Sequence, residues 1–225
     1  MCVEESLALF RALDDRPGVA AHCLEILRVL ASLEGDYARA CAYGEEIVEA
    51  HRALGDDQSV AIASGNLARM LWCAGDNGRA RTLLTESLGL FTALDNTWAV
   101  ASSLVNLGDV LRRLDDIEQA RASYTRALTM FRDTEHAHGI ATALMGLAAV
   151  AVARGRGARS AWLQGAAEAL TTATEHSLIP AERDEIARVE AHARALAGDT
   201  EYGAARVAGR AAPLDDMIAY ALEDA

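Results

Sequence analysis

Residues 97–128 read TWAVASSLVNLGDVLRRLDDIEQARASYTRAL, and this stretch holds one copy of the pattern that decides the fold. Its first part carries apolar residues every three or four positions, at Leu104, Leu107, Val110, Leu111 and Leu114. That spacing predicts an amphipathic helix over 97–114. Asp115-Asp116 then interrupts the pattern and can cap a second helix, which runs from Ile117 to about Asp133. The unit is therefore a helix, a short turn and a helix.

The same unit recurs at a constant spacing on both sides of this stretch. The residues that agree in register are Leu27, Leu67, Leu107 and Leu147, together with Ala40, Ala80 and Ala120. A fixed period of about 40 residues is typical of solenoid proteins, in which each unit buries its apolar face against its neighbours. We therefore expect an all-α fold built from about four helix-turn-helix repeats.

Within one unit, the pattern Leu104, Leu107-Gly108, Leu111, Asp116, Ala120, Tyr124 and Ala127-Leu128 resembles the tetratricopeptide repeat consensus. The resemblance covers roughly residues 18 to 175 and implies a right-handed superhelix, an α-solenoid with a helical C-terminal cap. The fourth unit departs from the pattern at Arg156, Ser160 and Gln164, as expected where stacking ends. The predicted organisation is a solenoid over 1–178 and a cap over 179–225. The solenoid units are a half-repeat over 1–17 and then 18–58, 59–98, 99–138 and 139–178.

Beyond about residue 178 the repeat is lost, and three shorter helices are expected. The first follows Ile179-Pro180 and runs to about Leu196, the second runs from Gly198-Asp199 to about Gly209, and the third begins at Pro213. Proline suits the start of a helix because its missing N–H would have no partner there. These helices would cover the apolar face of the last repeat.

The C-terminal part carries a second resemblance, through residues 162–170, 180–183 and 202–222. Together they are similar to the region that closes the repeat arm in bacterial regulators, the LuxR- or AfsR-type STAND ATPase activators common in actinobacteria. The resemblance implies that this chain is the sensor or interaction arm of a transcriptional regulator. A nucleotide-binding loop and a basic recognition helix, which such regulators contain, are absent from the sequence given.

The charge balance excludes several classes of function. The net charge is −12, and all 21 cationic residues are arginine. Nucleic-acid affinity rests mainly on phosphate neutralisation, so direct binding of nucleic acid is not expected. A chain without lysine cannot form a Walker A loop or a lysine Schiff base. No nucleophile elbow or HExxH helix is present either, so we expect neither an enzyme nor a cofactor.

Cysteine and histidine give no strong metal signal. Cys2, Cys23, Cys41 and Cys73 have no C-x-x-C spacing, and we interpret them as small buried apolar residues in a reducing compartment. The close pair His136 and His138 has no third ligand at suitable spacing, so these histidines are interpreted as solvated turn residues. Paired acids such as Asp56-Asp57 recur where helices start, and capping explains them.

The sequence contains no apolar run long enough to cross a bilayer, so no membrane span is predicted. Its start, Met1-Cys2-Val3-Glu4-Glu5, lacks the basic and apolar regions of a signal peptide. The expected location is the cytoplasm.

The tetratricopeptide resemblance implies a ligand-binding concave face lined by the first helix of each pair. Among the positions it places there are Ile26 and Val29 of the first repeat and Ile62 of the second, and eight residues are the binding candidates: Asn66, Arg69, Trp72, Asn106, Asp109, Arg112, Arg113 and Met145. Asn66 and Asn106 share a register slot that in peptide-binding members holds an asparagine bonded to the ligand backbone, since an amide both donates and accepts. The alternative is that each is a solvated or locally bonded polar residue. The arginines would favour carboxylate or phosphate ligands, and Trp72 would add an apolar contact.

Two hypotheses about function follow. In the first, the chain is the arm of a signalling regulator that binds a protein, a peptide or a small-molecule effector. In the second, it is a free-standing scaffold that assembles with itself, as a homodimer, or with another protein. A P-loop encoded upstream or a helix-turn-helix encoded downstream would support the first hypothesis, and a dimer in solution would support the second.

Overall fold

The structure is a computed structural model and describes residues 17–171 and 179–223. Except for Pro17, the half-repeat expected over 1–17 lies outside the described residues, as do Cys2 and the end of the fourth unit at 172–178. The organisation into a solenoid ending at 178 and a cap from 179 stays a prediction.

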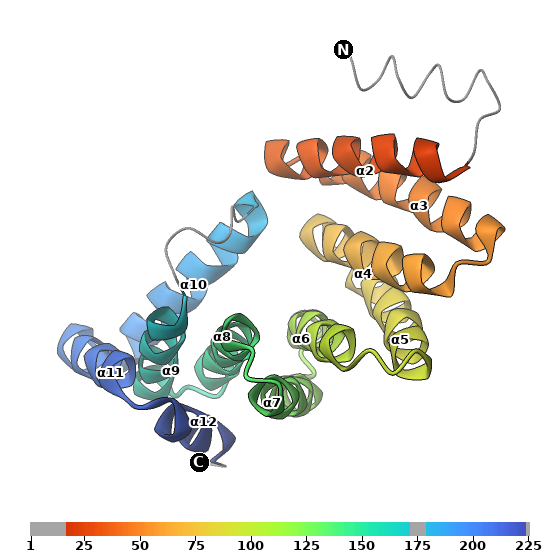
Figure 1. Cartoon of the computed structure of the whole chain (residues 1–225). Coiled ribbons are helices and arrows are strands. Elements are labelled where there is room, and N and C mark those ends of the chain that lie inside the picture. The colour runs from red at the N-terminus through yellow and green to blue at the C-terminus, as the bar shows by residue number, and fades with distance from the viewer. Residues whose placement is uncertain (1–16, 172–178, 224–225) are drawn as a thin grey trace. The chain divides into compact units, whose positions relative to one another are not determined.

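All described regular structure is helical, which confirms the all-α helical-repeat fold (Figure 1). The paired helices of the repeats are α2 (Pro17–Glu34), α3 (Tyr37–Leu54), α4 (Asp57–Ala74), α5 (Asn77–Ala93), α6 (Thr97–Arg113), α7 (Ile117–Asp133), α8 (Ala137–Ala153) and α9 (Gly157–Leu170). The C-terminal helices are α10 (Pro180–Ala197), α11 (Asp199–Ala211) and α12 (Leu214–Leu222). The three helices expected after residue 178 are thus present, and Pro180 begins the first of them as expected.

Every turn between the repeat helices contains one residue in the left-handed conformation. These residues follow each other at a constant interval: Gly35, Gly55, Gly75, Asp95, Asp115, Glu135 and Gly155, with φ between 52° and 88°. A left-handed residue after the last helical turn redirects the chain and lets its amide satisfy a terminal carbonyl. The repeat therefore consists of two half-units of equal length, each one helix and one such turn.

The residue after most of these left-handed positions caps the next helix. Asp36, Asp56, Asp76 and Asp116 accept a hydrogen bond from the backbone N–H three residues on, over 3.0–3.3 Å. This satisfies an amide that the helix leaves unpaired, and such a cap stabilises by about 1 kcal/mol. At the start of α9 the cap position is Arg156, which makes no such bond. The capping role predicted for the paired acids at Asp56 and Asp116 is confirmed.

His136 fills the cap position of α8, so its interpretation as a solvated turn residue is wrong. The side chain is half-buried, and Nδ1 accepts a hydrogen bond from Gly139 N at 2.9 Å. Its ring lies 5.5 Å from Phe131 and 6.2 Å from Trp98, centroid to centroid. The imidazole replaces the aspartate because its unprotonated nitrogen can accept the same bond.

The contacts divide the chain into two compact units. The first comprises the described residues up to Asn96 together with Ile179–Ala181, and the second comprises Thr97–171 and 182–223. In the first unit, α2 packs on α3, α3 on α4 and α4 on α5 around a core that includes Leu27, Leu67, Leu84 and Phe91. Cys23 and Cys41 are buried there, as expected, and Cys73 is half-buried.

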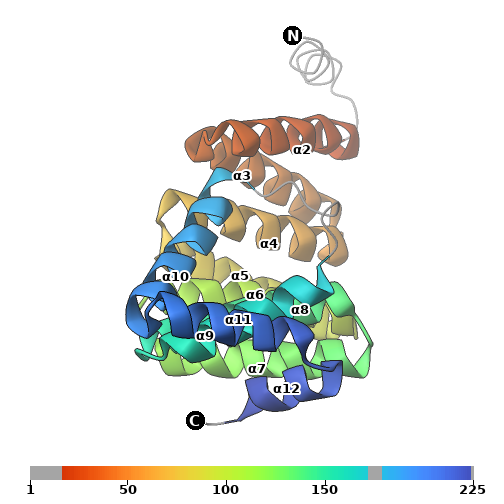
Figure 2. The ribbon, with the colours of Figure 1, turned by 90° about the vertical axis from the view of Figure 1, so that its left-hand side faces the viewer.

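In the second unit, α6 to α9 pack successively, and α11 packs closely along α9 (Figure 2). Two glycines permit this approach. A Cβ atom at Gly209 would lie 1.9 Å from Trp162 O, and one at Gly165 would lie 2.0 Å from Arg206 O. Because neither position has room for a side chain, the backbones of α9 and α11 are in direct contact. The glycines belong to the two segments, 162–170 and 202–222, that carry the second resemblance.

Candidate functional site

In the first unit, the predicted binding residues lie on α4. Asn66 and Arg69 are half-buried, and the Asn66 side chain makes no hydrogen bond within the described residues. Trp72 is only 6% exposed, so the expectation that it offers an apolar contact to a ligand is wrong. Burying an indole removes a large apolar area from water, so the side chain stabilises the packing of the unit.

The first unit does expose apolar side chains at other inner-helix positions. Ile26 and Val29 occupy, in the first repeat, the register positions of Asn66 and Arg69, and they are 39% and 40% exposed. Ile62, one turn before Asn66 on α4, is 48% exposed. Sequence reasoning placed these three residues on the concave face by their register, but it did not include them among the eight binding candidates.

In the second unit, Asn106 on α6 and Met145 on α8 are half-buried. The Asn106 amide, like that of Asn66, makes no hydrogen bond within the described part of the chain. The two asparagines therefore share a register slot and an unengaged amide. The alternative in which each asparagine is bonded to its own surroundings therefore does not apply to them, and the alternative of a solvated polar residue is left.

Asp109 is engaged by the core of the second unit. Tyr124, on α7, is fully buried, and its Oη donates a 2.6 Å hydrogen bond to Asp109 Oδ1. The ring fits between α6 and α8 because Gly108 and Gly146 leave space for it: a Cβ atom at Gly146 would lie 2.3 Å from the ring. Burial raises the pKa of Asp109 to about 6, although the bond from Tyr124 and the charge of Arg112 oppose the shift.

The expectation that Arg112 and Arg113 hold positive charge ready for a ligand also needs correction. Both guanidinium groups contact the carboxylate of Glu185 on α10, Arg112 at Oε1 and Arg113 at Oε2, the latter over 3.3 Å. The side chains of Arg112 and Glu185 are 12% and 11% exposed. Burial by itself would raise the pKa of Glu185, but Arg112, Arg188 and Arg113 hold it below its ordinary value.

The two arginines belong to the third repeat alone. The same register positions hold Ser32 and Leu33 in the first repeat, Trp72 and Cys73 in the second, and Val152 and Ala153 in the fourth. Helix packing within the repeat therefore does not require guanidinium groups there. Both contact Glu185 of α10, a helix that lies beyond the fourth repeat in the sequence, and Arg112 also interacts with Asp109 and Tyr124.

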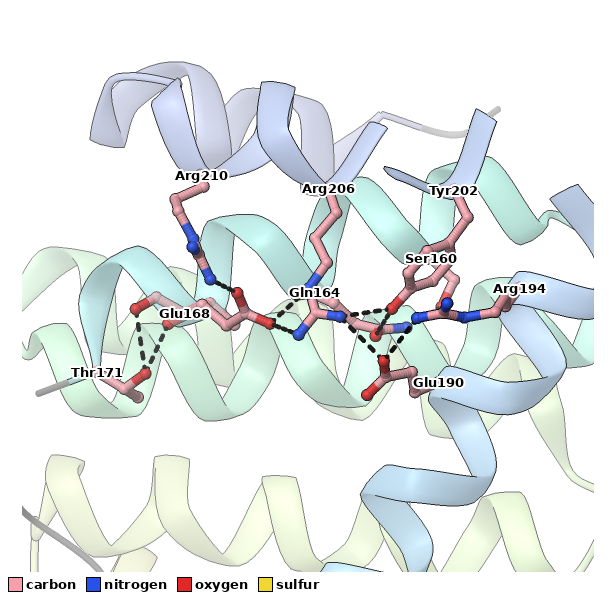
Figure 3. Close-up of polar contacts among 10 residues, drawn as sticks. Ser160, Gln164, Glu168, Thr171, Glu190, Arg194, Tyr202, Arg206 and Arg210 are labelled. Carbon is pink, nitrogen blue, oxygen red and sulfur yellow. Dashed lines mark hydrogen bonds and ion pairs between the residues drawn. The ribbon is translucent and has the colours of Figure 1, made fainter. Parts of the chain in front are cut away.

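A second polar cluster joins α9, α10 and α11 (Figure 3). Tyr202 Oη donates to Gln164 Oε1 at 3.1 Å, and Gln164 Nε2 donates to Ser160 Oγ at 3.0 Å. Arg206 donates to Tyr202 Oη, to Glu168 and to Glu190 over 2.8–3.0 Å. The hydrogen bond to Glu168 is the main cause of a raised pKa for Arg206. Buried polar groups need partners, and this cluster supplies them.

Sequence reasoning interpreted Ser160 and Gln164 only as departures from the repeat. They occupy the register of Ala120 and Tyr124, so polar residues stand where a small and a large core residue stand in the third repeat. The presence of polar residues at these two core positions was the signal that a polar partner covers α9, and that partner is Tyr202 together with Arg206.

Arg159 ties the last helix to the fourth repeat. Its Nη2 donates to the carbonyl oxygens of Tyr220 and Glu223 at the end of α12, over 2.8 and 2.9 Å. The guanidinium also lies 4.6 Å from the centre of the Tyr220 ring. A cation suits this position because the C-terminus of a helix carries partial negative charge.

In the described ranges, no three of the side chains that bind metals are grouped as a metal site would require. Among the helices the structure describes, none combines the length and apolar character needed to cross a membrane.

Comparison with known proteins agrees with the repeat geometry. The profile of the tetratricopeptide repeat matches residues 24–93 and 99–159. No curated protein sequence matches the chain. Among solved structures, the chain is similar to BtubC (BKLC) from P. vanneervenii, with 19% identity and a TM-score of 0.64 over 97% of this chain and 86% of that one. That likeness supports the fold. Because the profile covers more than half of its residues, the chain belongs to the tetratricopeptide repeat family.

Proposed function

We propose that this chain is a non-catalytic module that binds a protein or peptide through the inner helices of its repeats. In our proposal it is the sensor or interaction arm of a bacterial transcriptional regulator and acts in the cytoplasm. Tetratricopeptide repeats imply a protein-interaction module. The similarity of segments 162–170, 180–183 and 202–222 to the closing region of such regulator arms supports the more specific role.

The observation that carries the binding proposal is the pair of unengaged asparagines. Asn66 and Asn106 occupy the same position in successive repeats, are half-buried and have no hydrogen bond to the described residues. A primary amide at a protein surface that stabilises nothing in the fold can donate to and accept from a ligand backbone. Each asparagine lies on the first helix of its pair, on the face that the repeat leaves for partners.

Site-specific photo-crosslinking tests this proposal. A photoreactive residue is placed at position 66 or 106, and matched controls carry it at Gly89 on α5 or Ala122 on α7, which are exposed positions on second helices. In a lysate of the source organism, we expect the inner positions to yield a discrete crosslinked protein that the outer positions do not yield. The same products from both faces, or products from the outer positions only, would contradict the binding mode.

The regulator role has a separate test. The reading frame around this segment is expected to encode a nucleotide-binding loop upstream or a helix-turn-helix downstream. A frame that encodes neither would remove the regulator role and leave the binding proposal standing.

A further inference from the structure

The inner helix of the third repeat already holds a carboxylate, and that carboxylate comes from the chain itself. Glu185 lies between Arg112 and Arg113 and is nearly buried. Two guanidinium groups that share one carboxylate form a strong, directional site, since charge-assisted hydrogen bonds are shorter and stronger than neutral ones. The structure therefore shows a carboxylate site at the end of α6 with an occupant in place.

The occupant, α10, is held unevenly along its length. Its C-terminal half packs on α9 and α11, where Ala193 is buried with Ala161 and Tyr202, whereas residues 180–188, which include Glu185, contribute no buried apolar side chain. Of its side chains only Val189 and Ala193 are buried, whereas Ile186 and Leu196 are 38% and 50% exposed. Ion pairs also attach this helix, through Glu185 to α6 and through Glu190 to Arg206 of α11. Segments with few buried apolar contacts open at a lower free energy than the core does.

We propose that α10 is an internal occupant of this site, and that an acidic, helix-forming segment of a partner protein binds at Arg112 and Arg113 by displacing it. This inference rests on the proposed function and specifies the ligand of the third repeat. Glu185 shows where the partner's carboxylate lies. The inner helix of the third repeat is closed until such a segment competes for it.

The charges around the site select a single carboxylate. When α10 leaves, Arg188 leaves with it, because both Glu185 and Arg188 belong to that helix. Arg112 and Arg113 then remain, with Asp109 close to Arg112 and bonded to Tyr124. Two cations and one ionised Asp109 leave one net positive charge. That charge matches one carboxylate better than a phosphate dianion.

Displacement also needs a partner of sufficient effective concentration. A tethered helix competes with an effective concentration on the order of millimolar, so a free segment binds the intact chain weakly. Any change that loosens α10 should raise the affinity for the free segment, because the fraction of competent sites increases.

Hydrogen exchange of the full chain tests whether Glu185 holds α10 in place. The variant Glu185→Gln keeps the size of the side chain and removes its charge, and Asp184→Asn is the matched control because Asp184 is exposed on the same helix. We expect amides of α10 to exchange at least about tenfold faster in Glu185→Gln, with those of α7 unchanged, and no change in Asp184→Asn. Equal protection of α10 in both variants would overturn the proposal.

A peptide added in trans tests whether the site accepts a segment from outside. The probe is a labelled peptide with the sequence of α10, and fluorescence anisotropy measures its binding. It is expected to bind the Glu185→Gln chain at least about tenfold more tightly than the Asp184→Asn chain. A peptide that itself carries Glu185→Gln should lose this binding, and inorganic phosphate at a concentration on the order of millimolar should not compete.

Binding that ignores the peptide's carboxylate, or competition by phosphate, would overturn the assigned chemistry. These measurements use the chain's own helix as the probe, so they are independent of crosslinking at positions 66 and 106. If hydrogen exchange shows that α10 stays equally protected in Glu185→Gln, this inference is wrong, and the proposed function is unaffected. If crosslinking at positions 66 and 106 fails but the peptide still binds, the proposed function is wrong and the carboxylate site at Arg112 and Arg113 is unaffected.

Discussion

The two compact units use the same repeat but differ at their inner helices. In the first unit, inner-face positions expose Ile26 and Ile62, and nothing in the described chain bonds the amide of Asn66. In the second unit, Arg112 and Arg113 are engaged by Glu185. The packing positions repeat from one unit to the next, whereas most inner-face positions do not. The residues at the packing positions recur because the fold requires them. The residues at the inner face differ between repeats, so the fold does not determine them.

The largest effect is expected where the C-terminal helices join the second unit. Gly209→Val would place a side chain where a Cβ atom already lies 1.9 Å from Trp162 O, so α11 could not stay on α9. We expect a loss of more than about 3 kcal/mol in the unfolding free energy, from overpacking and from the exposed polar cluster of α9. Chemical denaturation followed by circular dichroism measures it.

Gly203→Ala is the control for that change, because a Cβ atom at Gly203 would have no neighbour within 4 Å. On the same helix it should stabilise by about 0.5–1 kcal/mol. Hydrogen exchange should show the effect of Gly209→Val in the second unit and not in α2 to α4. Equal destabilisation of both units would contradict their description as separate compact bodies.

The next effect concerns pH and again separates the units. The pKa of Asp109 is raised to about 6, so the folded chain holds a proton that the unfolded chain releases. Its contribution to stability is present below the unfolded pKa near 3.8 and is lost as the pH rises through 6. We expect the second unit to lose about 1–3 kcal/mol between pH 4 and pH 7 from this group.

Asp109→Asn should remove this slope, because an amide accepts the bond from Tyr124 without titrating. Glu185 acts in the opposite sense and only at the acid end of this range. Its pKa lies below the ordinary 4.5, so its contribution to stability begins to fall as the pH drops through that value, and the slope from Asp109 is therefore measured between pH 5 and pH 7. Urea denaturation at several pH values gives the slope, and an unaltered slope in the variant would assign it to another group.

A smaller effect should come from the cap positions. Arg156→Asp would give α9 the cap that Asp116 gives α7, and we expect a gain of about 0.5–1 kcal/mol. Asp116→Ala should lose a similar amount. Thermal unfolding of both variants checks the pair, and a loss of stability in Arg156→Asp would show that Arg156 has a structural role beyond this position.

The smallest effect on stability is expected at the asparagines. Asn66→Ala and Asn106→Ala should each change the unfolding free energy by less than about 0.5 kcal/mol, since their amides bond nothing in the described chain. Affinity for the crosslinked partner should fall by about 1–3 kcal/mol, the worth of the lost hydrogen bonds. Lost stability with unchanged affinity would assign both residues to the fold.

Local features allowed the helices to be predicted closely. The helices expected over 97–114 and from Ile117 to about Asp133 correspond to α6 and α7, because periodicity and an acidic cap act within a few residues of each other. The binding residues were predicted less well. Trp72 is buried, Asp109 is bonded to Tyr124, and the arginines are paired with Glu185. Each of these outcomes depends on a residue from another helix.

The sequence by itself determined where the repeat helices begin and end. The left-handed residue in each turn, and the cap that follows it in most turns, act through bonds that span three or four positions. The sequence also determined the stacking register, because Ala and Leu recur at matching positions of successive units, as at Leu67 and Leu107. Only the tertiary structure decided what covers each inner helix. Arg112 and Glu185 are 73 residues apart, and no periodicity links them. Their contact forms because burying one charge is tolerable only when the packed helices bring its partner to it.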